Sequence, residues 1–272
     1  MAGALTDAFE MAAQTDTGMR RVHNEDAVFA NPKLGLAILA DGMGGCNAGE
    51  VASGLATLLL STGLEAALLK EFAQENHERS GKSFTHDCVL KNIEAANKAI
   101  WCAAQNQAQY AGMGTTLVTA LFYNNKVTVA HLGDSRLYRL RGDEFSALTH
   151  DHSLLQEMLD EGTITREEAR FSDSKNLVTR ALGAQAEAHA EIYDYPVLPG
   201  DLYLLCSDGL TDCVEDWEIR EGLLVLQASG DGLAHAAQKL IRMSNEKGGR
   251  DNVSVILIRV LCAFTSDRSP RC

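Results

Sequence analysis

The chain has 272 residues, of which 46% are hydrophobic and 22% are charged, as in an ordinary globular protein with a sizeable core. Its formal net charge is −13, which argues against binding to a phosphate backbone or an anionic membrane as its main function. We therefore expect neither nucleic acid nor membrane among its partners.

The seven cysteines form no C-x-x-C pair and no regular spacing. We therefore expect neither a disulfide framework nor a zinc site, and a reduced, cytoplasmic location fits best. Acidic Asp7 and Glu10 and the lack of an apolar segment distinguish the N-terminus from a signal peptide. The longest apolar runs, such as Leu58–Leu60, are too short to span a bilayer.

The first part of the chain predicts strands and then two long helices. Phe9–Gln14 alternates weakly, and Leu34–Ala40 is a short apolar run that indicates a buried strand. Apolar residues at helical spacing predict helices over Glu50–Glu71 and Asp87–Gln109. The polar stretch Gln74–Ser83 separates these two helices.

A β-rich block follows the second helix. Segments rich in Thr, Val and Leu predict strands over Thr115–Tyr123, Lys126–Leu132 and Ser135–Leu140. Asn124-Asn125 and Gly133-Asp134 join these strands and are typical of hairpin turns. Hairpins imply antiparallel pairing, because parallel strands need longer crossovers.

The last part alternates between helices and strands. Helices are predicted over Asp151–Glu161, Thr165–Phe171, Asp216–Gln227 and Gly232–Glu246. Strands are predicted over Tyr193–Val197, Asp201–Cys206 and Asn252–Val260. Strands in runs and helices in pairs favour a layered α+β domain over a doubly wound parallel sheet. The residues after Cys262 are expected to form a loose tail.

Acidic clusters lie where strands should end. They are Asn24-Glu25-Asp26, Asp41-Gly42-Met43-Gly44-Gly45, Gly133-Asp134-Ser135-Arg136, Ser207-Asp208-Gly209-Leu210-Thr211-Asp212 and Gly248-Gly249-Arg250-Asp251-Asn252. Carboxylates are hard oxygen ligands of the kind that Mg²⁺ and Mn²⁺ accept. A single Asp-Gly pair indicates only a turn, whereas turns alone explain this ordered set poorly.

These clusters, together with Arg21-x-x-Asn24 and Gly114-Thr-Thr, resemble in order the motifs of the metal-dependent serine/threonine protein phosphatases of the type-2C family. The Met in Asp-Gly-Met-Gly-Gly resembles the bacterial form. The resemblance implies an α+β fold, a sandwich of two antiparallel β-sheets flanked by pairs of α-helices in four layers (αββα). It also implies a single catalytic domain over 1–262, with a flap segment at about 150–182 and a tail over 263–272.

The resemblance implies a binuclear Mn²⁺ or Mg²⁺ centre. Asp41, Asp208 and Asp251 match the core catalytic ligands, and Gly42 contributes its backbone carbonyl. Asp26 matches an acid that holds a metal-bound water.

Further residues surround this centre. Glu25 and Asn252 are expected just outside the ligands, where Glu25 would orient waters. Asp134 and Asp212 match ligands of a possible third, weaker ion, and one helical turn would bring Asp212 beside Asp208. A solvated or helix-terminal acid is the alternative for Asp212.

Arg21 matches the arginine that binds the substrate phosphate, and a guanidinium fork suits a phosphate dianion. Its neighbour Arg20 is the alternative. Met43 stands where the eukaryotic branch has a histidine, so the proton donor to the leaving group is unassigned. The segment Phe171–Asn176 lacks the His-Pro pair that members of the resembled family often carry, so the flap departs from the family pattern.

Three histidines and two cysteines complete the candidates. His150 and His152 are general-acid candidates by proximity alone, and the alternative is the start of a helix capped by Ser153 or Asp151. His23 has no assigned role. The two cysteines near Asp208 have no arginine six residues later and are expected to be packing residues, namely Cys206 and Cys213.

The sequence therefore predicts a phosphatase that hydrolyses phosphoserine and phosphothreonine in proteins by attack of a metal-activated water. Its partners are expected to be phosphorylated substrates of a serine/threonine kinase, and the protein is expected to be a monomer. The alternative is a non-catalytic phosphoprotein-binding or partner-switching regulatory domain on the same fold.

Overall fold

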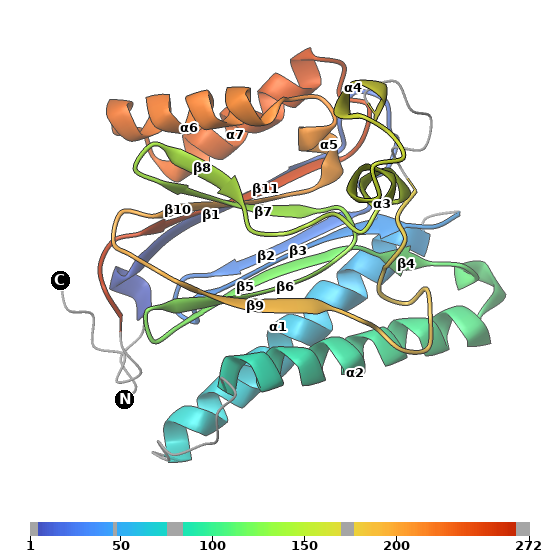
Figure 1. The fold of residues 1–272 in the computed structure, drawn as a ribbon. Helices are drawn as coiled ribbons and strands as arrows, with labels where there is room; N and C mark the ends of the chain where they lie inside the picture. Colours follow the sequence, from blue (N-terminus) through green and yellow to red (C-terminus); the bar gives the residue numbers. More distant parts are fainter. Residues whose placement is uncertain (1–4, 46–47, 75–83, 170–176, 265–272) are drawn as a thin grey trace.

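The computed structural model describes residues 5–45, 48–74, 84–169 and 177–264. Within them, two β-sheets lie face to face, and a pair of long helices covers the outer side of each sheet (Figure 1). The order of layers is α1 and α2, one sheet, the other sheet, then α6 and α7. The predicted α+β sandwich of antiparallel sheets is confirmed.

All described strand pairs in both sheets are antiparallel. The first has the order β1 (Phe9–Asp16), β11 (Val253–Val260), β10 (Leu202–Cys206), β7 (Arg136–Arg141) and β8 (Glu144–Ala147). The second has the order β2 (Asp26–Asn31), β3 (Leu36–Met43), β5 (Leu117–Tyr123), β6 (Lys126–Leu132) and β9 (Glu191–Pro196), and β4 (Gly114–Thr115) pairs with β3.

Strand β3 shows why its sequence is uniformly apolar. Ala37 and Leu39 pack between the two sheets, whereas Leu36 and Ile38 pack toward the helix layer. A strand covered on both faces needs apolar side chains at every position. At the centre of the sandwich, the Phe122 ring lies edge-on to the ring of Tyr203, with their centroids 5.3 Å apart.

The helices α1 (Ala48–Gln74) and α2 (Phe84–Asn106) cover the second sheet. The window Ala48–Lys70 is long and apolar enough to cross a membrane, with a mean hydropathy of 1.5. However, its buried residues recur at helical spacing and pack in the core with β3, as Ala52, Ala56, Leu60 and Leu64 show. A core helix therefore accounts for the apolar composition of α1.

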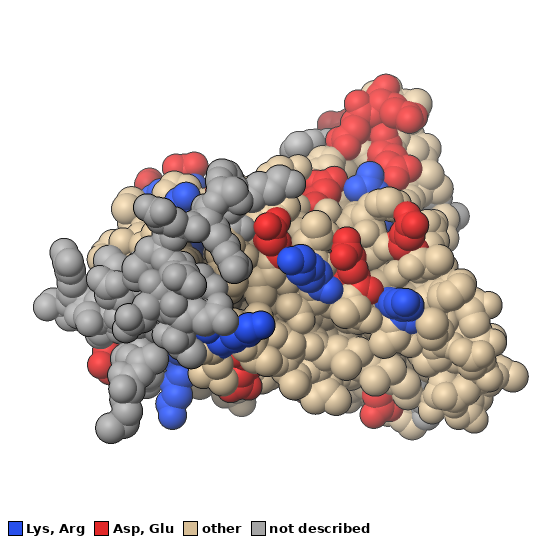
Figure 2. All heavy atoms as spheres, turned by 90° about the horizontal axis from the view of Figure 1, so that it is seen from below, with Lys and Arg blue, Asp and Glu red and all other residues tan. Residues whose placement is uncertain are grey.

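The outer surface on this side carries few charges. Figure 2, viewed from below, shows a mainly uncharged face with a few separate charged side chains and a group of acidic side chains at its upper right. Leu58, Leu59 and Leu69 of α1 are exposed.

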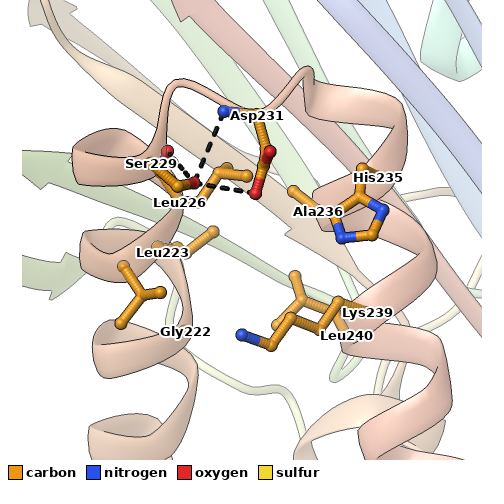
Figure 3. Close-up of a pocket in the computed structure, with 10 residues that line it drawn as sticks. Gly222, Leu223, Leu226, Ser229, Asp231, His235, Ala236, Lys239 and Leu240 are labelled. Carbon is orange, nitrogen blue, oxygen red and sulfur yellow. Dashed lines mark hydrogen bonds between the residues drawn. The ribbon is translucent and has the colours of Figure 1, made fainter.

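The helices α6 (Asp216–Ser229) and α7 (Leu233–Glu246) cover the first sheet. Glu215 and Glu218 form a capping box at the start of α6, which satisfies its first backbone N–H groups. Figure 3 shows the crevice where α6 and α7 meet, with Leu223 and Leu240 at its floor. Its volume of about 40 Å³ has room for a few waters only.

The remaining elements are short. They are the 3₁₀ turns Leu5–Asp7 and Ala108–Tyr110 and the helices α3 (Leu154–Asp160), α4 (Arg166–Ala169) and α5 (Asp208–Thr211). Part of the expected flap, 170–176, and most of the expected tail, 265–272, lie outside the described residues.

One predicted hairpin is confirmed and one is wrong. Asn124 and Asn125 have positive φ values of 50° and 57° and join the paired strands β5 and β6, as a two-residue turn requires. Gly133-Asp134 instead carries the chain from β6 in one sheet to β7 in the other. Both strands are buried, so their apolar patterns do not reveal which strand each one pairs with.

Two edge strands, β2 and β8, were not predicted. β2 follows the polar run before Asp26, and β8 has only four residues. Among the described cysteines, Cys102, Cys206 and Cys213 have free thiols, whereas Cys262 is disulfide-bonded. The expectation of reduced cysteines is therefore wrong at Cys262.

Candidate metal centre

Acids from both sheets converge at one end of the sandwich. Asp26 opens β2 and lies directly opposite Asp41 of β3 in the strand register. Asp208 is the first residue of α5 and follows β10 after one intervening residue, and Asp251 lies two residues before the start of β11. Asp134 occupies the connection between β6 and β7. The ends of separate strands thus bring together carboxylates that are distant in sequence.

Two glycines allow this close approach. A Cβ atom on Gly209 would lie 1.9 Å from the backbone oxygen of Asn252, so only glycine lets the start of α5 reach the segment that carries Asp251. A Cβ on Gly42 would lie 2.1 Å from the backbone oxygen of Gly49. The predicted role of Gly42 as a backbone ligand agrees with this lack of a side chain.

The carboxylate of Asp26 is held from one side only. Its Oδ2 accepts hydrogen bonds from the hydroxyls of Ser254 at 2.6 Å and Ser207 at 2.9 Å. Its Oδ1 is buried without a hydrogen-bond partner. Burial raises the pKa of Asp26 to about 6. One oxygen is therefore fixed, and the other is left available.

The pKa values of Asp41 and Asp208 are raised like that of Asp26. Burial, followed by the charges of neighbouring acids, raises the pKa of both carboxyls well above the usual range. Asp208 Oδ1 is also buried without a partner, although both residues keep some accessible surface. Carboxylates crowded in this way repel one another, and a cation relieves the repulsion.

The donor set fits a hard divalent ion. Buried oxygens without partners are uncommon in native proteins and call for an explanation such as an ion. All side-chain groups in this cluster are carboxylates, which suit Mg²⁺ or Mn²⁺ rather than softer metals. The orphaned oxygens of Asp26 and Asp208 therefore fit the implied ions.

Arg21 lies beside the cluster. Its Nη2 donates to Asp251 Oδ2 at 2.6 Å, and half of its side chain, 51%, is exposed. The hydrogen bond to Asp251 raises the pKa of Arg21, so the guanidinium stays charged. Arg20 is exposed and makes no ion pair with the described acids. The geometry distinguishes the two arginines in favour of Arg21.

Asn252 joins the loop that carries Arg21 to the acids. Its Oδ1 accepts from the Glu25 N–H at 2.8 Å, and its Nδ2 donates to the backbone oxygens of Thr17 and His23. Its own N–H donates to Asp251 Oδ1 at 2.8 Å. Asn252 thus holds backbone in place.

Asp134 and Asp212 lie beside Asp208. The Asp212 N–H donates to the Asp208 oxygen at 2.8 Å, which places the two one turn apart as expected. Both Asp134 and Asp212 raise the pKa of Asp208 through their charges. Burial, followed by the charge of Asp151, raises the pKa of Asp134 to about 6.

The general-acid candidates have other partners. His150 Nε2 lies 2.6 Å from Asp160 Oδ2. His152 is buried against His131. Ser153 caps α3 by accepting from the Gln156 N–H, so the alternative interpretation of this segment as a helix start is confirmed.

His23 is exposed and joins the site only through its backbone oxygen. Cys206 is fully buried in β10, and burial raises the pKa of its thiol to about 12, which agrees with a packing role. Sequence reasoning missed the two serines that hold Asp26. Ser207 adjoins Asp208, but Ser254 lies 228 residues from Asp26, and no local sequence pattern predicts that contact.

Comparisons with known proteins place these features in context. Residues 19–257 match the family model described as protein phosphatase 2C. The serine/threonine phosphatase stp of Listeria innocua is 39% identical over 90% of this chain and 93% of its own. The serine/threonine protein phosphatase PstP of Mycobacterium tuberculosis is 37% identical over 94% of this chain and 46% of its own.

Solved structures of serine/threonine phosphatases are also similar to this chain. A crystal structure of the M. tuberculosis phosphatase PstP/Ppp superposes with a TM-score of 0.81 at 36% identity, over 93% of this chain and 99% of that chain. A crystal structure of the PstP catalytic domain in complex with two manganese ions has a TM-score of 0.79 at 37% identity, with the same coverage of 93% and 99%.

Proposed function

The chain belongs to the protein phosphatase 2C family and is a metal-dependent serine/threonine protein phosphatase; from this premise, we propose that Asp26, Asp41, Asp208 and Asp251 form its two-ion centre. The observation that carries the assignment is the pair of buried, partnerless oxygens on Asp26 and Asp208. Asp26 begins β2 and Asp208 follows β10, so the ion positions depend on the rigid sandwich.

The ions would be Mn²⁺ or Mg²⁺, as in the family. When bound, they supply an activated water and neutralise charge on the phosphoryl oxygens. Asp41, Asp208 and Asp251 are the core ligands of this proposal, and Gly42 adds its carbonyl. The Ser207 and Ser254 hydroxyls hold Asp26 Oδ2 and so leave Oδ1 for the centre.

Arg21 binds the substrate phosphate in this proposal. It lies at the rim, stays charged and is half exposed, so a phosphate dianion can reach it and form two parallel hydrogen bonds. Asn252 positions the loop that carries Arg21, and Glu25 lies between that loop and α1. Asp134 and Asp212 would hold a third ion beside Asp208.

We also propose the substrates, the cellular location and the domain organisation of the protein. The substrates are proteins phosphorylated by a serine/threonine kinase, and the protein acts as a cytoplasmic monomer. Residues 1–262 form one catalytic domain in which about 150–182 acts as a flap toward the substrate. A non-catalytic binding role is disfavoured, because Asp41, Asp208 and Asp251 are all present.

Hydrolysis of a phosphothreonine peptide tests the proposal. We expect phosphate release in Mn²⁺, none in excess EDTA, and recovery when Mn²⁺ is added back. A phosphotyrosine peptide serves as the specificity control and should react more slowly. Release of phosphate in EDTA at the rate seen in Mn²⁺ would overturn the proposal.

A further inference from the structure

We propose that His152 is a positioning residue for the metal centre, which fixes the Gly133-Asp134 connection so that the Asp134 carboxylate faces the acid cluster. The proposal rests on the role of Asp134 proposed above. It concerns how that carboxylate is held, and it assigns His152 a role other than that of the general acid considered from the sequence.

His152 holds both backbone groups of Gly133. The His152 N–H donates to the Gly133 oxygen at 2.9 Å. In return, the Gly133 N–H donates to His152 Nδ1 at 3.2 Å. Gly133 immediately precedes Asp134 at the point where the chain changes sheets, and its φ is 98°. Two reciprocal bonds therefore fix a connection that no sheet pairing stabilises.

These contacts also determine the tautomer of His152. Burial lowers the pKa of the ring, so it carries one proton. Because Nδ1 accepts from Gly133, that proton lies on Nε2. His152 Nε2 is 3.2 Å from Glu191 Oε1, to which it donates. Arg180 Nη1 lies 3.2 Å from the same oxygen.

The plane of the His152 ring is fixed from one side. His131 stacks on it with ring centroids 4.7 Å apart and an interplanar angle of 11°. His131 is fully buried, and its Nε2 lies 2.9 Å from the backbone oxygen of His150. A ring clamped between this stack and two hydrogen bonds has little freedom to rotate.

The same three residues could be taken for a metal site, because ligand atoms of His131, His152 and Glu191 lie within 4.8 Å of one another. The geometry disfavours an ion there. The nitrogen lone pairs of two stacked rings lie in two separate, nearly parallel planes and therefore do not meet at one ion. His152 Nε2 carries the ring proton, and the Arg180 guanidinium lies 3.3 Å from that nitrogen.

His152 also joins the Gly133-Asp134 connection to the C-terminal part of the proposed flap, about 150–182. Its backbone oxygen accepts from the Thr179 N–H at 2.8 Å. Next to it, Ser153 and Val178 form a β-bridge. A single residue near the start of the flap thus links the connection that carries Asp134 to residues near the end of the flap.

Two substitutions distinguish the contact that Nδ1 makes with Gly133 from the contact that Nε2 makes with Glu191. In His152→Asn, the side-chain oxygen can occupy the place of Nδ1 and accept from Gly133. In His152→Gln, the terminal amide reaches toward Glu191 instead and leaves the buried Gly133 N–H without its acceptor. Glu191→Gln is the matched control, because its side-chain oxygen still accepts from Nε2.

The measurement is the Mn²⁺ concentration that gives half-maximal hydrolysis of p-nitrophenyl phosphate. We expect His152→Gln to raise it about five- to tenfold, as loss of a buried acceptor would, and His152→Asn and Glu191→Gln to change it little. Added to Asp134→Asn, His152→Gln should cause no further rise, because both act through the same carboxylate. Equal behaviour of the Asn and Gln variants, or additive effects, would overturn the proposal.

A second measurement does not depend on how the variants fold. Long-range ¹H–¹⁵N NMR of the wild-type protein with Mg²⁺ bound reports which ring nitrogen of His152 carries the proton. We expect the proton on Nε2, and a proton on Nδ1 would overturn the proposal. If wild-type hydrolysis shows no Mn²⁺ dependence, the proposed function fails instead, and the two failures are distinguishable.

Discussion

Arg21 and Asp251, 230 positions apart in the chain, form an ion pair of 2.6 Å at the rim of the acid cluster. The pair joins the residue proposed to bind phosphate to a residue proposed to bind an ion. In the metal-free chain, Arg21 offsets part of the negative charge that an ion would otherwise balance. In the proposed centre, Asp251 would bind the ion, and the guanidinium would then be available to a phosphate.

Arg21→Ala should therefore impair substrate binding more than ion binding. Hydrogen bonds to charged groups contribute about 1.5–3 kcal/mol, so we expect kcat/KM for a phosphothreonine peptide to fall roughly ten- to a hundredfold. The Mn²⁺ dependence should change little. Arg20→Ala is the matched control and should be mild. A silent Arg21→Ala beside a damaging Arg20→Ala would show that the neighbouring arginine binds the phosphate.

Asp208→Asn should abolish most activity at ordinary Mn²⁺ concentrations, because an amide lacks the ligand charge while its shape is preserved. Even residues outside the ligands change metal affinity or activity about 10–100-fold, so we expect a loss of at least about a hundredfold. The exposed Asp143→Asn is the control for the same chemical change. Full turnover by Asp208→Asn with wild-type Mn²⁺ dependence would exclude Asp208 as a ligand.

Mn²⁺ should raise the melting temperature relative to EDTA. A ligand at a hundred times its Kd stabilises the native state by about 2.7 kcal/mol, which corresponds to about 5–10 °C for a chain of this size. Differential scanning fluorimetry measures the shift. The shift should shrink in Asp41→Ala, and a wild-type melting curve that does not respond to saturating Mn²⁺ would contradict the centre.

Asp134→Asn should stabilise the metal-free protein at neutral pH. Burial raises the pKa of Asp134 from 3.8 to about 6, so the native state binds this proton more tightly than the unfolded chain does. The charged carboxylate therefore lowers the free energy of unfolding as pH rises from about 4, and the loss is complete above about pH 6. About two pKa units correspond to about 3 kcal/mol at most.

Urea unfolding in EDTA at several pH values checks this. The variant should be more stable than the wild type at about pH 7, and the difference should shrink as pH falls toward about 4. In saturating Mn²⁺ the order should reverse or the difference vanish, because the wild type regains a ligand. A constant difference at all pH values would mean that Asp134 ionises normally.

The acids of the site could be predicted from the sequence because each one lies in a short motif at the end of a strand. Asp41 follows the apolar run Leu36–Ala40, and Asp208 follows β10. The α6 and α7 helices were also predictable from their apolar spacing. These features depend on residues that are close together in the chain.

The features that could not be predicted depend on distant contacts. The Ser254 hydroxyl reaches Asp26 only because β11 lies beside β1 and across from β2. The change of sheet at Gly133 was mistaken for a hairpin, because strands buried on both faces look alike whichever neighbours they have. The His152 contact with Gly133 spans 19 residues and follows no helical or strand period.

The antiparallel pairing of β1 with β11 over Phe9–Asp16 has a consequence for biosynthesis. The first strand of the sandwich remains without its partner until the ribosome has translated as far as Val260. At about 5–20 residues per second, this delay is on the order of ten seconds or more. Until then, the edges of β1 and β10 that pair with β11 stay open, and open strand edges favour aggregation of the nascent chain.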